Sequence, residues 1–263
     1  AKVDWTGNGA VIFYDGSYVR EAVKITCAIS VDHNVHGVTF DANAKANVAG
    51  KFVAATVSEA IALWPNFYAS NIIARNVNRA DQTFPDGDGF RVDGGFNHAE
   101  VDNIRVHDCY MAVGADIALS QGIFGVTFAS NGSRRCRNVR LTNYHIENVW
   151  SEDATYKTDQ DGVRIFQEEA ERTGSCYVLQ GTVKNVSNRA IKLHSGVNAV
   201  VDGLYRELDS AVIPQSGAFS NPDIDSQQCP ATITNCRFHY DGAWHENLVR
   251  NYTEVAEGYQ YGG

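Results

Sequence analysis

The chain has 263 residues and a formal net charge of −9 at pH 7. This acidic balance argues against nucleic acid or an anionic membrane surface as a partner, and no apolar run approaches the ~20 residues that cross a bilayer. With 23 Gly and 5 Pro, the composition suits short strands joined by tight turns, and we expect one elongated domain over residues 1–263, with a terminal cap or tail at 241–263.

The ends and the cysteines carry little chemistry. The sequence opens at Ala1 and its only methionine is Met111, so we expect a processed product or a fragment of a longer chain. None of the six cysteines forms a C-x-x-C pair, which argues against a zinc site. Cys109 and Cys236 each follow an Asn or Asp that closes a repeated strand, so we predict that both are buried; a disulfide between Cys229 and Cys236 is the alternative.

Strand signals dominate along the chain, because apolar and polar residues alternate with period two between Asn, Asp and Gly. Asn tolerates the left-handed backbone that a sharp corner needs. The segment Ala46–Glu59 is the exception and is predicted to be a helix, with a short helical turn around Glu168–Arg172. The polar, acidic segment Ser151–Asp161 is predicted to protrude as a loop.

An apolar-x-apolar triplet returns through most of the chain, with a second strand-like element between its copies. A short strand repeated every two to three dozen residues predicts a solenoid, in which each coil contacts only its neighbours. The triplets are VTF (38–40), IAL (61–63), FRV (90–92), IAL (117–119), VRI (163–165) and IKL (191–193). The interval before 163–165 is about two coils long, so either Val126-Thr-Phe or Ile146-Glu-Asn forms a further coil, or a loop protrudes there.

The repeat texture, as in AIALWPNFYASNIIARNVNRA followed by DGFRVDGG, resembles the pectin-lyase-like superfamily over roughly residues 30–240. That resemblance implies an all-β fold, a right-handed parallel β-helix of about 8–10 coils. The opening AKVDWTGNGAVIFYDGS is similar to the first coils of phage tailspikes. Membership of that group implies a homotrimer, a polysaccharide partner and an extracellular or virion-surface location.

Superposing the triplets places their middle residues on one outward face. This column reads Thr39, Ala62, Arg91, Ala118, Arg164 and Lys192. Neighbouring carboxylates on such a face can divide into an acid and a base, as glycoside hydrolysis requires. The candidate catalytic residues are Asp88, Asp93, Asp116 and Asp161, and the candidate substrate-binding residues are Arg91, Arg164, Lys192, His194, Trp64 and Trp150.

Each of these residues also has a structural interpretation. Asp before Gly is ordinary turn chemistry, and Arg or Lys beside Asp on a sheet face forms a solvated salt-bridge ladder. Trp64 and Trp150 could stack against sugar rings or simply cover the core.

The order PDGDGF, VGADIAL, QGIFGVTFAS, DGVRIF is similar to the four motifs of polygalacturonase-type glycoside hydrolases. The likeness puts Asp88 and Asp116 at two of the family's carboxylates and Arg164 at its substrate-binding arginine. Ala115 stands where that family has its general acid, and the third motif lacks its histidine.

Phe166 replaces the family's lysine, so a hydrolase of this sequence needs another acid, for which Asp93 or Asp161 is the candidate. The leading hypothesis is a polysaccharide-degrading glycoside hydrolase without a cofactor or metal. A polysaccharide lyase or uronate epimerase is the first alternative; its cations would neutralise a substrate carboxylate, and calcium could be held by clustered Asp residues. The second is a non-catalytic adhesin or fibre segment, which Ala115 favours.

Overall fold

The computed structural model describes residues 2–28, 31–55, 64–80, 86–112, 122–129, 136–151, 160–166, 173–194, 196–209, 222–227, 229–241, 249–255 and 258–262. In these ranges the regular structure is entirely β and forms two sheets. Sheet A contains β1 (Lys2–Phe13), β3 (Asp32–Asp41), β5 (Asn66–Arg79), β7 (His98–Met111), β9 (Asn138–Ser151), β11 (Thr173–Val186), β13 (Gly196–Leu208) and β15 (Ala231–Thr234), with β16 (Arg237–Tyr240) also paired to β13. Sheet B contains β2 (Val19–Cys27), β4 (Ala46–Ala54), β6 (Asp86–Asp93), β8 (Gly122–Ala129), β10 (Gln160–Phe166), β12 (Ile191–His194), β14 (Ile224–Gln227), β17 (Val249–Val255) and β18 (Gly258–Gly262).

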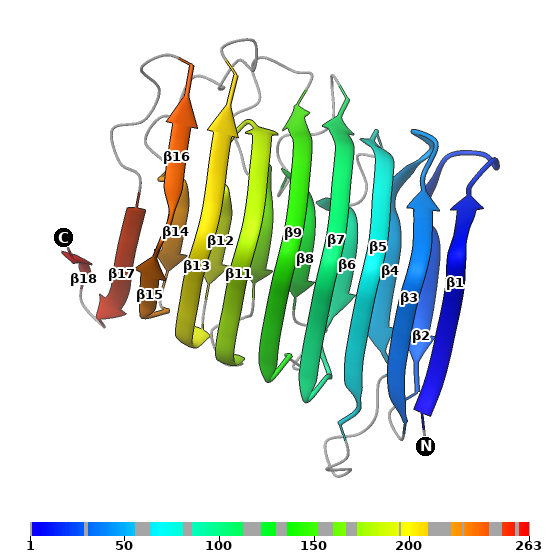
Figure 1. The fold of residues 1–263 in the computed structure, drawn as a ribbon, viewed down its shortest axis with the longest axis horizontal. Helices are drawn as coiled ribbons and strands as arrows, with labels where there is room; N and C mark the ends of the chain where they lie inside the picture. Colours follow the sequence, from blue (N-terminus) through cyan, green and yellow to red (C-terminus); the bar gives the residue numbers. More distant parts are fainter. Residues whose placement is uncertain are drawn as a thin grey trace.

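The chain alternates between the two sheets, which lie one behind the other in Figure 1. Neighbouring strands pair in parallel, apart from the antiparallel pair β17 and β18. Each passage through both sheets therefore returns one strand further along, which is the arrangement of a parallel β-solenoid. The predicted all-β, parallel-strand architecture is confirmed at this level. Among the described residues, no helix has the length and apolar character of a membrane span.

The predicted helix at Ala46–Glu59 is wrong over its described part, because Ala46–Ala54 forms β4 between β2 and β6. Small residues fill this strand because the interior is narrow, and a β-carbon added at Gly50 would lie 3.1 Å from the Phe40 ring. Tertiary packing overrides helix propensity here. Residues 56–63 and the predicted turn at Glu168–Arg172 lie outside the described residues.

The predicted column of triplet residues is partly wrong, because Thr39 lies in sheet A whereas Arg91, Arg164 and Lys192 lie in sheet B. Val126-Thr127-Phe128 is confirmed as the strand of the long interval, in β8. Ala62 and Ala118 lie outside the described residues. The paired positions along sheet B are Lys24, Lys51, Arg91, Thr127, Arg164, Lys192 and Asp225.

The long strands of sheet A bend at residues with left-handed backbone conformation. Asn71, Asn103 and Asn143 have φ of 54°, 50° and 52° and occupy equivalent places in β5, β7 and β9. Their side chains connect coils, since Asn103 Nδ2 donates to Asn71 Oδ1 at 2.6 Å. Asn adopts this conformation at little cost. The sequence prediction for Asn is confirmed, although the bends lie inside strands. A second set of bends follows at Asn76, Asp108, Asn148 and Asn185.

The cysteine predictions divide. Cys109 has no exposed surface, as predicted, and burial raises the pKa of its thiol. Cys236 is only half-buried, so the prediction of a buried residue is not met there. Asp202 pairs with Thr234, which places Cys236 beside Leu204 of β13. Cys229 and Cys236 are both free thiols, so the alternative disulfide is wrong.

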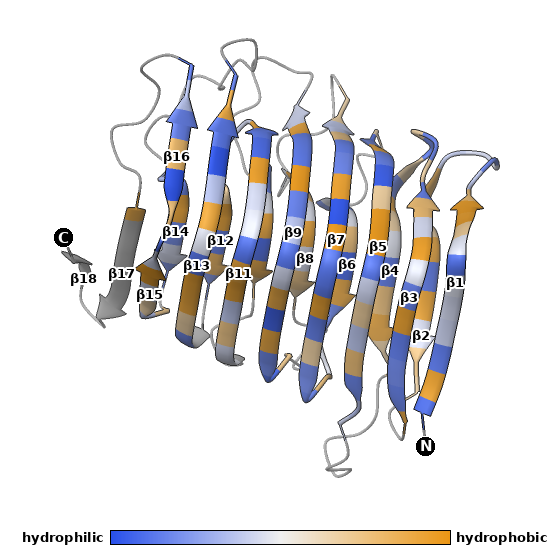
Figure 2. Cartoon of the chain, viewed as in Figure 1, coloured by the Kyte–Doolittle hydropathy of each residue, from blue (hydrophilic) through white to orange (hydrophobic). Residues whose placement is uncertain are grey.

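The core between the sheets is apolar and narrow, and hydrophobic and hydrophilic residues alternate along sheet A strands in Figure 2. Phenylalanine rings from both sheets meet there, with the centroids of Phe52 and Phe67 5.0 Å apart. Gly89, Gly125 and Gly162 occupy one column of sheet B because the opposite sheet leaves no room for a β-carbon. At Gly89 a β-carbon would lie 2.2 Å from Val106 Cγ1.

Gly89→Ala is therefore expected to lower the free energy of unfolding by about 1–3 kcal/mol, because it overpacks a closed interior. Ala190 occupies the same column three strands further on, just before β12, and already holds a β-carbon with no exposed surface. Ala190→Gly should cost about 1 kcal/mol or less, as removal of one methyl does. Urea unfolding of both variants measures the difference; equal losses would contradict the narrow-interior explanation.

Candidate functional site

The predicted face of sheet B exists, but a change of phase in β6 decides which side chains reach it. A β-carbon at Gly89 would point at Val106, and the next residue, Phe90, is buried in the core. Two consecutive residues thus face inward, and Asp88 and Arg91 on either side of them meet on the outer face at 3.1 Å. Strict alternation would have put these two residues on opposite faces.

Arg91 is the centre of an ionic group that we call the sheet B cluster. Its Nη1 lies 3.0 Å from Asp86 Oδ2 and 3.1 Å from Asp88 Oδ2, and its Nε lies 2.6 Å from Asp93 Oδ1. Lys51 Nζ contacts Asp93 Oδ2 at 3.1 Å. The cluster comprises Glu21, Lys51, Asp86, Asp88, Arg91, Asp93 and Arg164.

Two carboxyl groups of this cluster have pKa values shifted in opposite directions. Burial raises the pKa of Asp88 above its usual value, with the charge of Asp86 acting in the same direction and Arg91 against them. Burial would also raise the pKa of Asp86, but Arg164 and Arg91 outweigh it and hold that pKa below its usual value. Between the two pKa values, Asp86 is ionised while Asp88 holds a proton.

The two carboxyl groups differ in access to solvent. Asp88 has no exposed surface, whereas 12% of the Asp86 side chain is exposed. Asp88 Oδ1 makes no hydrogen bond of good geometry among the described residues, but the buried Thr127 hydroxyl on the next strand lies close enough to act against the raised pKa of Asp88. A ligand on this face therefore meets Asp86 first, while Asp88 lies beneath it beside Thr127.

Arg164 closes one side of the cluster. Its Nη1 lies 3.3 Å from Asp86 Oδ1, and its guanidinium lies over the rings of Phe124 and Phe166, 4.3 and 4.4 Å from their centroids. The ring of His194 stacks on Phe166, 5.0 Å between centroids. Arg164 and His194 thus lie on the predicted face, and both contact the ring of Phe166.

Asp161 belongs to a separate buried ionic group. Arg189 Nη1 lies 3.2 Å from Asp161 Oδ1, and Arg189 Nε lies 3.0 Å from Asp225 Oδ2. In the register of sheet B, Phe124 stands between Asp161 and Asp88, which puts their backbones about 10 Å apart. The structure therefore does not pair Asp161 with Asp88.

The remaining predicted residues are distributed over the molecule. Asp116 lies outside the described residues, and Lys192 is buried in the Arg91 column of sheet B. Trp64 precedes β5, and Cζ of Arg137 lies over the Trp64 ring, 3.9 Å from the ring centroid. Trp150 is in β9 of sheet A and packs on Tyr110, 4.9 Å between ring centroids. The ring contacts of both tryptophans in the described residues are thus with residues outside the sheet B cluster.

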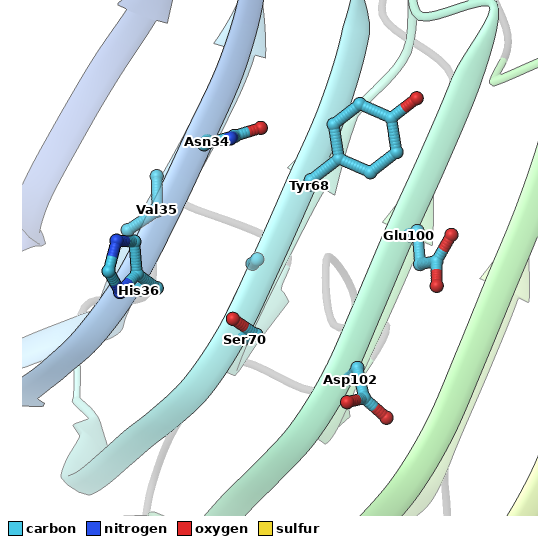
Figure 3. Close-up of a pocket in the computed structure, with 8 residues that line it drawn as sticks. Asn34, Val35, His36, Tyr68, Ser70, Glu100 and Asp102 are labelled. Carbon is cyan, nitrogen blue, oxygen red and sulfur yellow. The ribbon is translucent and has the colours of Figure 1, made fainter. Parts of the chain in front are cut away.

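Sequence reasoning missed Asp86 and Lys51. Asp86 precedes Asp88 by two residues in PDGDGF, so period-two alternation could have placed both on one face. Lys51 was not predicted on this face because its segment was predicted to be a helix. The sequence analysis also did not predict a hollow of about 260 Å³ on the outer face of sheet A, which Figure 3 shows. Its polar lining comprises Asn34, His36, Tyr68, Ser70, Glu100 and Asp102.

The described residues contain no group of three or more His, Cys, Asp or Glu side chains arranged to hold a metal ion. The chemistry that this geometry offers is that of paired carboxyl groups and cations on a rigid sheet face. In comparisons with known proteins, no family model, no curated protein and no solved structure matches the chain.

Proposed function

We propose that the protein is a polysaccharide-degrading glycoside hydrolase that acts on a bacterial surface or extracellular glycan. The observation that carries the proposal is the pair of neighbouring carboxyl groups, Asp86 and Asp88, with oppositely shifted pKa values. Environments that separate two carboxyl pKa values define an acid and a base, which is the machinery of glycoside hydrolysis. The setting that fits is a right-handed, tailspike-like β-helix that assembles as a homotrimer.

In this proposal Asp88 is the general acid and Asp86 is the ionised partner. Asp88 protonates the glycosidic oxygen as the bond to the sugar breaks, and Asp86, which is partly exposed, attacks the anomeric carbon. Water then releases the sugar from Asp86 and returns a proton to Asp88. Because Asp88 has no exposed surface, the bound glycan has to displace side chains that cover it.

The separation of the two groups favours retention of configuration. Asp86 Oδ2 and Asp88 Oδ2 share one partner, Arg91 Nη1, at 3.0 and 3.1 Å. Their separation therefore falls below the roughly 6.5–9.5 Å that leaves room for a water molecule in inverting enzymes. Nuclear magnetic resonance of the first-formed product anomer tests this point.

Reducing-end release from a panel of bacterial capsular and lipopolysaccharide glycans tests the activity. Asp88→Asn and Asp86→Asn are each expected to lower the rate about 10²–10⁴-fold, because each removes one proton-transfer or nucleophilic group. Glu207→Gln is the matched control; Glu207 pairs with Lys184 on sheet A, away from the cluster, and should keep its activity. Equal activity in all three variants would overturn the assignment.

The pH profile gives an independent check. Activity requires ionised Asp86 and protonated Asp88, so it should fall at acid pH through the lowered pKa of Asp86 and fall at higher pH through the raised pKa of Asp88.

The same two groups make the stability of the fold depend on pH. Asp86 stabilises the fold above the unfolded pKa of 3.8, and this contribution is lost as the pH falls through its folded pKa. The pH dependence of the Asp88 contribution to fold stability is the opposite. It is fully present below the unfolded pKa of 3.8 and is lost as the pH rises through the raised pKa of Asp88 in the folded protein.

A non-catalytic glycan-binding fibre segment is the second candidate. It is favoured by the ion pairs of Asp93 with Lys51 and of Asp161 with Arg189, which give both carboxylates a structural role. Binding of a glycan without release of reducing ends, in wild type and variants alike, would establish it in place of the hydrolase. Release of a product with ultraviolet absorbance that is abolished by EDTA would instead indicate a lyase.

A further inference from the structure

The hollow on the outer face of sheet A lies on the opposite sheet from the cluster. It is formed where β3, β5 and β7 run side by side, and Figure 3 shows its side chains in two rows across these strands. Asn34, Tyr68 and Glu100 form one row, and His36, Ser70 and Asp102 form the other. At about 260 Å³ it is close to the lower end of small-ligand pockets, roughly 300–1,000 Å³. This size suits one or two sugar rings.

The hollow combines an exposed aromatic ring with polar groups that are free to bind. Tyr68 is 36% exposed. Thr142 Oγ1 and Asn143 Nδ2 both donate to Asp102 Oδ1, at 2.5 and 2.8 Å, and among the described residues no hydrogen bond reaches Asp102 Oδ2. An apolar ring face beside a fixed carboxylate oxygen and the Ser70 hydroxyl suits a sugar, whose ring stacks while its hydroxyl groups donate.

Two of the lining side chains are held in place before any ligand arrives. Asn34 Nδ2 donates to Asp4 Oδ1 at 2.8 Å, and His36 Nε2 lies 2.8 Å from Thr6 Oγ1, both on β1. Side chains that are already ordered lose little entropy on binding, which favours affinity.

The charges around the hollow select the class of sugar. Glu100 and Asp102 line it, and the basic side chains near Glu100 are already in contact with it, since His98 Nε2 lies 3.0 Å from Glu100 Oε2 and Arg140 Nε lies 3.9 Å from Oε1. A uronate or a phosphorylated sugar would bring negative charge against two carboxylates. The lining therefore favours a neutral, hydroxyl-rich glycan.

The row that contains Tyr68 continues beyond the hollow. In the register of sheet A, Tyr68 is followed by Glu100, Arg140 and Tyr177. Tyr177 is 38% exposed and lies three strands from Tyr68, or about 14 Å. A glycan that crosses the strands would thus meet a second exposed ring after several sugar units.

We propose that the outer face of sheet A carries a binding site for a neutral oligosaccharide, with its first sugar on Tyr68 in the hollow and a later one on Tyr177. The site is separate from the sheet B cluster and does not depend on hydrolysis there.

Calorimetric titration with neutral hexasaccharides, namely cellohexaose, maltohexaose and mannohexaose, tests the proposal. At least one is expected to bind, and Tyr68→Ala should weaken that binding at least tenfold. Tyr177→Ala should weaken binding of the hexasaccharide but not of the matching disaccharide. Tyr205→Ala is the matched control, because Tyr205 is equally exposed but lies in another row of sheet A. The affinity of Tyr205→Ala for the hexasaccharide should stay within twofold of wild type.

Three results would overturn the proposal: no neutral hexasaccharide binds, binding is unchanged in Tyr68→Ala, or only acidic oligogalacturonate binds. Sedimentation that shows self-association of wild type, lost in Tyr68→Ala, would assign this face to a second copy of the chain instead. Asp88→Asn should bind the hexasaccharide like wild type, so failure of the hydrolase and failure of this site are distinguishable.

Discussion

Arg91→Met is expected to lower the free energy of unfolding by about 3–5 kcal/mol at pH 7, because removing one partner of a buried ion pair leaves charge without compensation. Arg91 contacts Asp86, Asp88 and Asp93. Lys51 and Arg164 still contact two of these carboxylates in the variant, but Asp88 keeps no ion-pair partner among the described residues. Methionine keeps an unbranched, flexible stem but lacks the guanidinium, so the loss reports mainly on the removed charge and its hydrogen bonds. Urea unfolding followed by circular dichroism measures it.

The control is Arg105→Met. Arg105 is 56% exposed on sheet A and pairs with Glu147 at 3.7 Å, so its removal should change stability by about 0–1 kcal/mol. The deficit of Arg91→Met should shrink as the pH falls towards 3.8, the usual pKa of an Asp carboxyl, because the crowded carboxyl groups then take up protons. An equal deficit at pH 7 and pH 4 would show that packing, not charge, causes the loss.

Arg206→Leu is expected to destabilise the C-terminal coils by a similar amount, about 3–5 kcal/mol. Arg206 and Asp223 have no exposed surface, and Arg206 Nε donates to Asp223 Oδ1 at 2.9 Å. Arg206 Nη2 also donates to the carbonyl oxygens of Val186 and Asn188, at 2.5 and 3.2 Å. The variant leaves both a buried carboxylate and two buried carbonyl groups without their donor.

The double variant Arg206→Leu/Asp223→Leu separates these contributions. Replacing both members of a buried pair by apolar residues is often close to neutral, so the double variant should be more stable than Arg206→Leu alone. What remains of the loss is assigned to the carbonyl groups of Val186 and Asn188, at about 1–3 kcal/mol each. Thermal unfolding of wild type and the variants gives the coupling energy; a double variant less stable than the single one would show that Asp223 does not depend on Arg206.

Local chemistry in the sequence accounts for much of the fold. Period-two alternation predicts strands, and the recurrent Asn residues predict left-handed bends, which the structure has at Asn71, Asn103 and Asn143. Both signals depend on a residue and its nearest neighbours in the chain, so they can be read without knowing what packs against them. The repeat of such signals at coil length predicts a parallel stack.

The sequence also places Asp88, Arg91 and Arg164 on one face, and the structure brings these three residues together around Asp86. It could not assign Asp161 to the separate group with Arg189, because that depends on which strand pairs with which. A small error in register moves a side chain one coil, about 4.8 Å, and exchanges its partners.

Three further features depend on contacts between distant parts of the chain. The narrow interior decided that Ala46–Ala54 is a strand and that Gly89 and Phe90 both face inward. Burial decided that the pKa of Asp88 is raised while that of Asp86 is lowered. The hollow at Tyr68 joins residues some thirty positions apart in the chain. Periodicity, bends and the residue types of each face can be read from the amino-acid sequence, because these are local properties. Packing and burial arise only when distant coils meet, so they required the folded chain.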